Sequence, residues 1–297
     1  MIGLFRYKSF LIGFTGIILL LISSIYIPFT GDGTHASILR KEDGTLLSAP
    51  YSPIDLPPFG SDRQGTSMFY KVIDGAKYTI FLMTVVSFFQ VFLSVFLAGI
   101  LILWGGYIKR AVYVILDSFN YMPTVILAII FMMPMMLTNL DKVSLFIMTI
   151  QIVFIIVIMS PSLILLIAQE IELILTKPYV VISILMGAGR WHLWKVHVWP
   201  SLKAPMVILF FQQCVQTSML FIYLGFFNVF LGGRVSTEGF ESAETYKSIV
   251  NEWSSLIAIY HTELLTAPWI ILAPTSMFAF TIFSLNLMKE GVVRYQK

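Results

Sequence analysis

The stretch YTIFLMTVVSFFQVFLSVFLAGILILWGGYI, Tyr78–Ile108, decides the fold, because it contains no Asp, Glu, Lys or Arg. A helix needs about 20 predominantly apolar residues to cross the hydrocarbon core of a bilayer. Backbone inside a bilayer must satisfy its own hydrogen bonds, so a run of this length predicts a transmembrane helix. The number of further runs of this kind therefore predicts how many times the chain crosses the membrane.

Five other stretches are equally free of charge and strongly apolar. The whole chain agrees with them, since 58% of its 297 residues are hydrophobic and only 12% are charged, against about 25% charged in a soluble domain. This composition excludes a soluble enzyme, a disordered chain and a disulfide scaffold, and it predicts an all-α integral membrane protein. The six predicted spans are Ser9–Gly31, Tyr78–Ile108, Ser118–Leu140, Val143–Gln169, Ala204–Gly233 and Leu264–Met288.

Charge assigns an orientation to these six spans. Placing the N-terminus in the cytoplasm puts 11 basic and three acidic residues on that side, and eight basic and 12 acidic residues on the other. This is the asymmetry of the positive-inside rule. The first apolar run, Phe10–Phe29, exceeds the roughly 7–15 residues of a signal-peptide core. We therefore expect residues 1–31 to hold a retained first span with a cytoplasmic N-terminus, and both chain ends to lie inside.

Two segments predicted to lie outside the cytoplasm are too long to be simple turns. Residues 32–77 are rich in Pro, Gly, Asp and Ser, which predicts an extended loop with many turns. Its last part, Met68–Lys77, predicts a short helix on the membrane surface. In the second segment, Gly232–Glu263, the stretch ETYKSIVNEWSSLIAIY has helical periodicity, and Trp253 and Tyr260 suit the membrane interface.

The cytoplasmic segment at 170–203 reads EIELILTKPYVVISILMGAGRWHLWKVHVWPSLK. It predicts a helix over 179–186, a turn at Gly187 and Gly189, and a second short helix over 190–199 that Pro200 stops. Tryptophans alternate with basic residues in the second helix, which is typical of an amphipathic element on a membrane surface. The same pattern suits an element that inserts aromatic side chains into a cytoplasmic partner. Both interpretations stay open on this segment alone.

This segment resembles the cytoplasmic loop of ABC importer permease subunits of the dipeptide, oligopeptide and nickel group. That loop begins with Glu-Ala-Ala, followed after three residues by a glycine and thirteen positions further by a proline. Gly187 and Pro200 match this spacing. Further matches are Tyr179, Val180, Ala188 and His197, whereas Val181, Ile182 and Ser183 replace the triplet.

Other matches follow in the same order, so that the resemblance covers about residues 1–295. PFGSDRQG, Pro58–Gly65, resembles the outside segment after the first span, although Gly65, Thr66 and Ser67 stand where that family has Gly-Arg-Asp. LLTAPWIILAP, Leu264–Pro274, and NLMKEG, Asn286–Gly291, resemble its last span. Single matching positions are Trp253, Asp117 and Pro123.

The resemblance implies the transmembrane domain of a type I ABC importer, which forms half of a pathway for peptides. Residues 32–77 would be an extracytoplasmic loop, and 78–297 a five-helix permease core with its coupling loop at 170–203. The implied partners are a second homologous permease subunit as heterodimer partner, one or two ABC ATPase subunits, an extracytoplasmic substrate-binding protein and membrane lipid, with no nucleic acid. The implied location is the inner or plasma membrane of a bacterial or archaeal cell.

Two sets of residues are candidates for the work of such a subunit. The resemblance implies that the ATPase contacts Gly187, Ala188, Gly189, Arg190, Trp191, His192, Leu193 and Pro200. Polar groups inside a span are costly in lipid and usually face a partner or a cavity. The candidates for lining the transport pathway are therefore Gln212, Gln213, Gln216, Thr217 and Asn228. Hydrogen bonding between helices is the alternative for this second set. Gln212 and Gln216 share one helix face, and Asp117 is expected to be a structural or interfacial group near the cytoplasmic end.

The sequence has no motif for an energy source or for catalysis. It lacks the phosphate-binding G-x-x-x-x-G-K-[ST] loop, the G-x-S-x-G elbow and the H-E-x-x-H zinc motif. Four scattered histidines and the lone Cys214 argue against a metal site. We expect a non-catalytic subunit without a cofactor, whose partner ATPase binds ATP and magnesium. Two alternatives remain: a nickel or metal-chelate importer of the same fold, and a signalling or scaffolding subunit without transport, which the altered triplet suggests.

Overall fold

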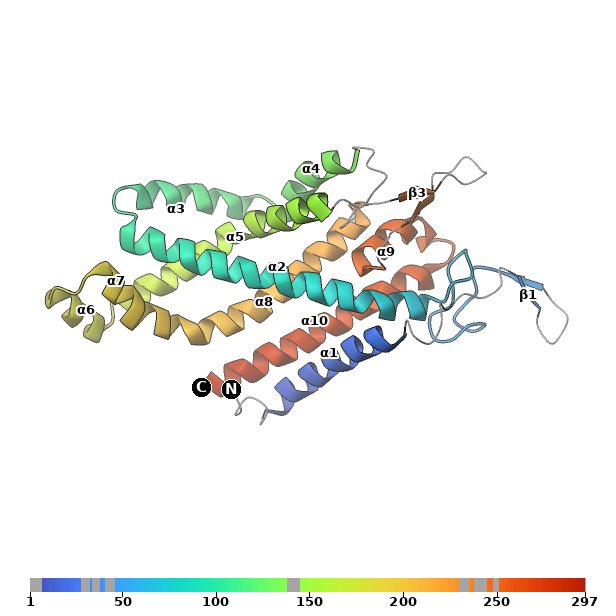
Figure 1. The fold of residues 1–297 in the computed structure, drawn as a ribbon, viewed down its shortest axis with the longest axis horizontal. Helices are drawn as coiled ribbons and strands as arrows, with labels where there is room; N and C mark the ends of the chain where they lie inside the picture. Colours follow the sequence, from blue (N-terminus) through green and yellow to red (C-terminus); the bar gives the residue numbers. More distant parts are fainter. Residues whose placement is uncertain are drawn as a thin grey trace.

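The computed structural model describes residues 7–27, 33, 38–40, 46–137, 145–229, 235–237, 245–247 and 251–296. Long helices make up most of this part of the chain (Figure 1). Within it, five helices are long and apolar enough to cross a membrane: α1 (Lys8–Tyr26), α2 (Met68–Trp104), α5 (Leu145–Leu175), α8 (Trp199–Phe226) and α10 (Pro268–Gln296). The chain is therefore an all-α, multi-pass membrane protein, as its composition predicts.

The third predicted span, Ser118–Leu140, is not one straight helix. α3 (Ile108–Ser118) and α4 (Thr124–Leu137) meet at a bend of 86°. Pro123 accounts for the break, because a proline disfavours helical backbone at the residue before it, and Met122 is extended with φ −99° and ψ 123°. The described residues contain six spans if this bent pair is one crossing, and five if it is not.

Shorter elements connect the long helices. They are η3 (Phe119–Tyr121), α6 (Pro178–Leu185), α7 (Arg190–His192), the π-helix η4 (Leu193–Val198), α9 (Trp253–Tyr260), η5 (His261–Leu264), and two antiparallel hairpins made by β1 (Ile38–Arg40) with β2 (Leu46–Ser48) and β3 (Val235–Thr237) with β4 (Thr245–Lys247). In Figure 1, α6 and α7 lie at one end of the bundle, the α6 end, and α9 lies toward the other, the α9 end. The start of α1 and the close of α10 point toward the α6 end, where the ring centroids of Tyr7 and Tyr295 are 6.3 Å apart.

The central helix of the bundle is α2, which contacts α1, α5, α8 and α10. One cluster of buried apolar residues joins it to α5, α8, α9 and α10, and a second joins it to α5 and the start of α8 nearer the α6 end. The outer helix α1 packs on α10, where Gly13 faces the backbone of Ser284 and Gly291 faces Phe10. Small residues let two helices approach closely where lipid gives no hydrophobic drive for their association.

Three predictions for the outside segments are wrong. Met68–Lys77 is not a separate surface helix but the first turns of α2, because no proline interrupts the segment and its apolar side chains pack in the core. The helix predicted from Glu244 shrinks to α9, because residues 245–247 form β4 and pair with β3. Trp253 does not lie at the membrane interface, since it is fully buried and its indole N–H donates to the carbonyl of Val72 at 2.7 Å.

Candidate functional site

A tight turn joins α6 to α7 at the α6 end. Gly187 has φ +86°, a left-handed conformation that glycine adopts without steric cost. Its N–H donates to the carbonyl of Ile184 at 2.9 Å, and the N–H of Ala188 donates to the carbonyl of Ser183 at 3.1 Å. These two bonds form the Schellman motif, which ends a helix on a left-handed residue. The predicted turn is confirmed, and its geometry requires a residue that accepts positive φ.

The helix after this turn differs from the prediction. Pro200 does not stop it, because α7, η4 and α8 follow one another without a break from Arg190 to Phe226. A proline inside a helix removes one backbone hydrogen bond and crowds the carbonyl four residues back, so the regular bonding pattern must change around it. Just before it, the N–H of Trp199 already bonds to the carbonyl of Trp194, five residues back, in the π-helix. The turn is therefore continuous with a membrane span.

Contacts between the two arms hold the turn in place. Val180 of α6 is fully buried, and Leu193 of η4 is 7% exposed. The Nε2 of His197 lies 3.2 Å from the hydroxyl oxygen of Ser183, and the ring centroids of Tyr179 and His197 are 5.8 Å apart. Ser183 belongs to the altered triplet, so the changed residues still contribute a contact that fixes the turn.

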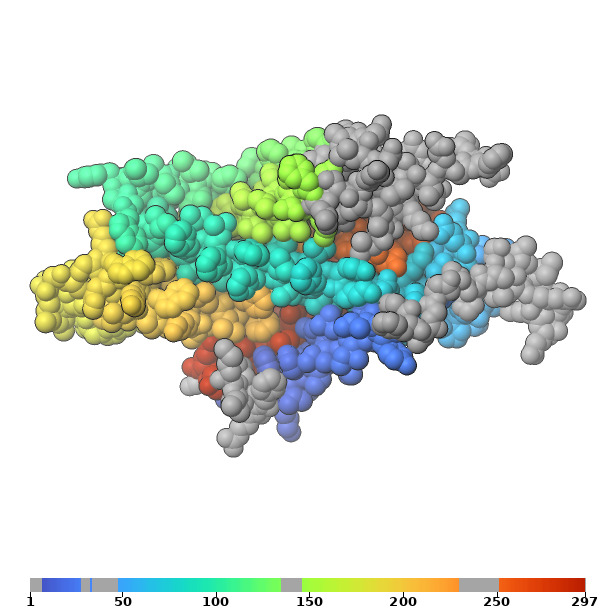
Figure 2. All heavy atoms as spheres, in the orientation of Figure 1, coloured from blue at the N-terminus to red at the C-terminus, as the bar shows by residue number. Residues whose placement is uncertain are grey.

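Apolar side chains remain exposed on this turn. Ile182, Leu185, Met186 and Trp191, with exposed fractions of 56, 80, 83 and 67%, form a surface that we call the apolar tip. Figure 2 shows the yellow atoms of this region projecting past the end of the blue-green α2. An exposed apolar surface of this kind marks a contact with a protein or with a membrane.

The structure divides the predicted coupling residues. Gly187–His192 lie on or beside the exposed turn, whereas Leu193 is buried and Pro200 lies further along the helix. Leu185 and Met186 are more exposed than any of these apolar candidates, and the sequence prediction missed them. Both residues could have been identified from the sequence, because they lie at the end of an apolar helix, directly before the glycine that ends it.

The predicted pathway residues of α8 divide between two faces. Gln213 and Thr217 are buried, and the Thr217 hydroxyl oxygen lies 3.2 Å from that of Ser87 in α2. Gln216 is exposed and Gln212 is half-buried. Hydrogen bonding between helices therefore accounts for Thr217, while Gln212 and Gln216 form the polar part of a face that this chain leaves uncovered.

The fifth pathway candidate, Asn228, and the predicted structural or interfacial group Asp117 lie outside α8. Asn228 follows the end of α8 with φ +58°, and its Nδ2 is 3.3 Å from Nε2 of His261. Asp117 is exposed near the end of α3, where its carboxylate accepts a bond from the Nδ2 of Asn120 at 3.1 Å. Gln213 and Thr217 are buried and Asn228 lies beyond the last residue of α8, so the five pathway candidates do not form one site.

Buried polar groups in α2 escaped the sequence prediction. Gln90 and Ser94 are fully buried, and Nε2 of Gln90 donates to the sulfur of Met159 at 3.2 Å. Among the described residues, Oε1 of Gln90, Oγ of Ser94 and Oε1 of Gln213 have no hydrogen-bond partner. The criterion applied to α8, a polar group inside a span, also identifies these residues of α2.

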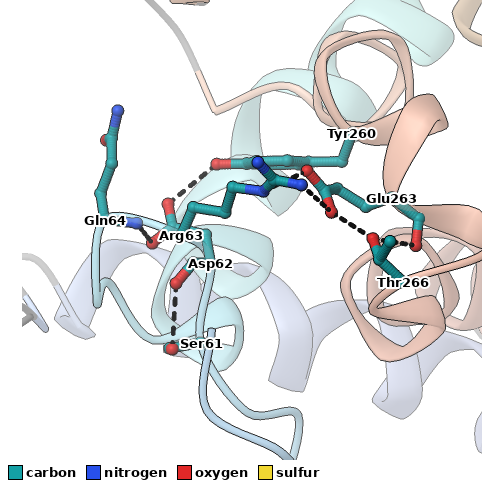
Figure 3. A network of polar contacts seen from close by, with 7 residues as sticks. All are labelled: Ser61, Asp62, Arg63, Gln64, Tyr260, Glu263 and Thr266. Atoms are coloured by element: carbon teal, nitrogen blue, oxygen red, sulfur yellow. Dashed lines mark hydrogen bonds and ion pairs between the residues drawn. The ribbon is translucent and has the colours of Figure 1, made fainter. Parts of the chain in front are cut away.

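At the α9 end, a polar network ties the loop before α2 to α9 and η5 (Figure 3). The buried carboxylate of Asp62 pairs with the ammonium of Lys71 and accepts the hydroxyl of Tyr260 at 2.9 Å. Nearby, Nε of Arg63 lies 2.6 Å from the carboxylate of Glu263. Burial, together with the charge of Asp62, raises the pKa of Tyr260 and keeps its hydroxyl protonated as a donor. The network therefore joins segments 198 residues apart.

A second buried carboxylate caps α9. Glu252 is 1% exposed and accepts bonds from the N–H groups and hydroxyls of Ser254 and Ser255 at 2.6–3.1 Å. Burial raises the pKa of Glu252, and these hydrogen bonds oppose the shift. The three buried carboxylates at this end, those of Asp62, Glu252 and Glu263, are all used in structural bonds, and we call this end the rigid cap.

Replacing the two kinds of polar residue in α8 should separate their roles. Thr217→Val leaves the buried Ser87 hydroxyl without this partner, and we expect a loss of about 1 kcal/mol in the free energy of unfolding. Gln216→Leu removes no bond within the bundle and should leave the midpoint of thermal unfolding unchanged. Thermal denaturation of both variants in one detergent measures this, and equal destabilisation would contradict the division into two faces.

Within the described ranges, no three His, Cys, Asp or Glu side chains gather closely enough to hold a metal ion. No family model matches the chain, and no curated protein matches it. The case for a function therefore depends on its own residues and their geometry.

Proposed function

We propose that the chain is the transmembrane permease subunit of an ATP-driven ABC importer whose cargo is peptide. The observation that carries the proposal is the apolar tip, which is held on a glycine-closed turn and is continuous with the span α8. The apolar tip serves as the surface that docks into a separate ATPase subunit. The in-order resemblance of the sequence to peptide-type permeases supports the same function.

A movement of the apolar tip would be transmitted to the membrane-spanning part of the chain through one continuous helix. The unbroken helix from Arg190 to Phe226 connects the turn to α8. The exposed face of α8 carries Gln216 and part of Gln212, which suit a pathway formed with a second, related permease subunit. Closure of the ATPase pair moves the turn, and α8 moves with it. The energy comes from the partner because this sequence has no phosphate-binding loop.

Charge supports the assignment of sides. The positive-inside rule places the α6 end in the cytoplasm, where an ATPase subunit would be, and the α9 end outside. The rigid cap of the α9 end then faces the compartment of a substrate-binding protein. We place the complex in the inner or plasma membrane of a bacterial or archaeal cell.

Site-specific photo-crosslinking tests the docking surface. A photoreactive residue in place of Met186 should capture a protein that also binds a radioactive azido-ATP analogue in native membranes. Leu265 is 94% exposed at the α9 end and gives a matched control, since a photoreactive residue there should capture no ATP-binding protein. If Met186 yields only lipid adducts, the apolar tip is a membrane anchor and the proposal is wrong.

Uptake separates the alternatives that share this architecture. Vesicles that contain the full complex should accumulate labelled peptide when ATP is present on the ATPase side. Accumulation of nickel chelates in place of peptide would assign the metal-chelate alternative. ATPase capture at Met186 without any uptake would assign a scaffolding or signalling role.

A further inference from the structure

An aromatic cavity lies between α2 and the helix that follows the turn. It has a volume of about 380 Å³ and is lined by Phe92, Val95, Phe96, Trp191, Trp194, Lys195 and Trp199. This volume is within the range of about 300–1,000 Å³ found for ligand pockets. Gly99 of α2 lets the indole of Trp194, one of the lining residues, pack directly on the helix backbone. Six of the seven lining side chains are apolar, so the cavity suits an apolar ligand.

One charged side chain, that of Lys195, lines this apolar cavity. Lys195 is exposed, and it makes no ion pair with any residue that the structure describes. The sequence from Leu173 to Thr237 contains no acidic residue, whereas Arg190 and Lys203 add positive charge to the same stretch of helix. The cavity therefore combines apolar walls with one exposed cation that has no ion-pair partner in the described part of the chain.

An apolar track leads away from the cavity along α2. Phe88, Phe92 and Phe96 recur every four residues and so share one face of the helix. Each is a little more than half exposed, and the rings of Phe88 and Phe92 stack at 6.4 Å. The three positions extend about 12 Å along the helix axis. A track of this length and chemistry suits a lipid acyl chain.

We infer that this cavity binds one molecule of an anionic glycerophospholipid. Its phosphate pairs with Lys195, and an acyl chain fills the space among the tryptophans and follows the phenylalanine track. Basic residues beside tryptophan at a membrane interface, next to a pocket between helices, are the chemistry that recognises an acidic lipid headgroup. The bound lipid would bridge α2 and the helix that carries the apolar tip, and would therefore stabilise their packing.

Tryptophan quenching tests the site, because three of the six tryptophans of the chain line the cavity. The full chain is reconstituted in phosphatidylcholine vesicles that contain a small fraction of either phosphatidylglycerol or phosphatidylcholine with brominated acyl chains. We expect brominated phosphatidylglycerol to compete for the site about fivefold better than brominated phosphatidylcholine, the preference that one lysine confers. Lys195→Gln should abolish this preference, and Lys195→Arg should keep it.

A matched control is Lys203→Gln, which removes an exposed positive charge of the same helix outside the cavity and should keep the preference. Equal quenching by the two brominated lipids, or a preference that survives Lys195→Gln, would overturn the inference. Quenching by neither lipid would mean that protein covers the cavity, which also overturns it. The measurement needs neither an ATPase nor cargo, so its failure would leave the proposed function untouched.

Discussion

In the importer complex proposed above, Gly187→Val is expected to insert and fold but to lower substrate-stimulated ATP hydrolysis by about 5- to 30-fold, because a left-handed residue other than glycine costs about 1–2 kcal/mol. The strain is in the backbone and not in a clash, since a Cβ placed on Gly187 meets no atom within 4 Å. The β-branched valine fits positive φ poorly, so the Schellman bonds to Ile184 and Ser183 should be lost. The apolar tip would then no longer be presented in one orientation.

The control for this experiment is Gly187→Asn at the same position. Asparagine enters the left-handed region much more readily than valine, so most of the coupled hydrolysis should remain. A second control is Gly189→Ala, because Gly189 has an ordinary φ of −68° and open space around it. Coupled hydrolysis that is equal in the valine and asparagine variants would show that the conformation of the turn does not matter for coupling.

The spans were predictable because their signal is local. A long apolar run without charge predicts a span from its own residues, and α1, α2, α5, α8 and α10 each cover most of one of the predicted runs. The bend between α3 and α4 was not predicted, although Pro123 is the residue that causes it. A search for uncharged residues alone does not register a proline, and the run from Ser118 therefore appeared continuous.

The sequence pattern could not predict which side chains are buried by packing between distant helices. A tryptophan next to a span suits the membrane interface on composition alone, yet Trp253 packs edge-on against Phe278 with ring centroids 5.1 Å apart. Its place depends on α2 and α10, which are far away in the sequence. For the same reason, the sequence did not separate the buried Thr217 from its exposed neighbour Gln216.

The turn of the candidate site was predictable because it requires a particular residue. A glycine between an apolar helix and a basic, tryptophan-rich helix predicts a left-handed turn wherever the bundle places it. The continuous helix through Pro200 was not predictable in the same way. It depends on the π-helical turn before the proline, which no residue type specifies.

Lys71→Met is expected to lower the free energy of unfolding by about 3 kcal/mol, because it leaves the buried charge of Asp62 without its cation. The Asp62 side chain is fully buried, and that of Lys71 is 14% exposed. The variant also removes the bond from the Lys71 ammonium to the hydroxyl of Tyr260 at 2.9 Å. The remaining donors to Asp62, which are the N–H groups of Gln64 and Thr66 and the hydroxyl of Tyr260, limit the loss. Thermal denaturation in detergent should show a midpoint lower by several degrees.

A double variant shows whether the unpaired charge is the cause. Adding Asp62→Asn to Lys71→Met keeps an amide oxygen for the two backbone donors but removes the charge, so most of the lost stability should return. Arg294→Met breaks an exposed pair with Glu290 and serves as the matched control, with an expected loss of only about 0.3–0.5 kcal/mol. If the double variant is less stable than Lys71→Met alone, the buried charge is not what destabilises the cap, and the network of Figure 3 would owe its stability to the hydrogen bonds of Tyr260 instead.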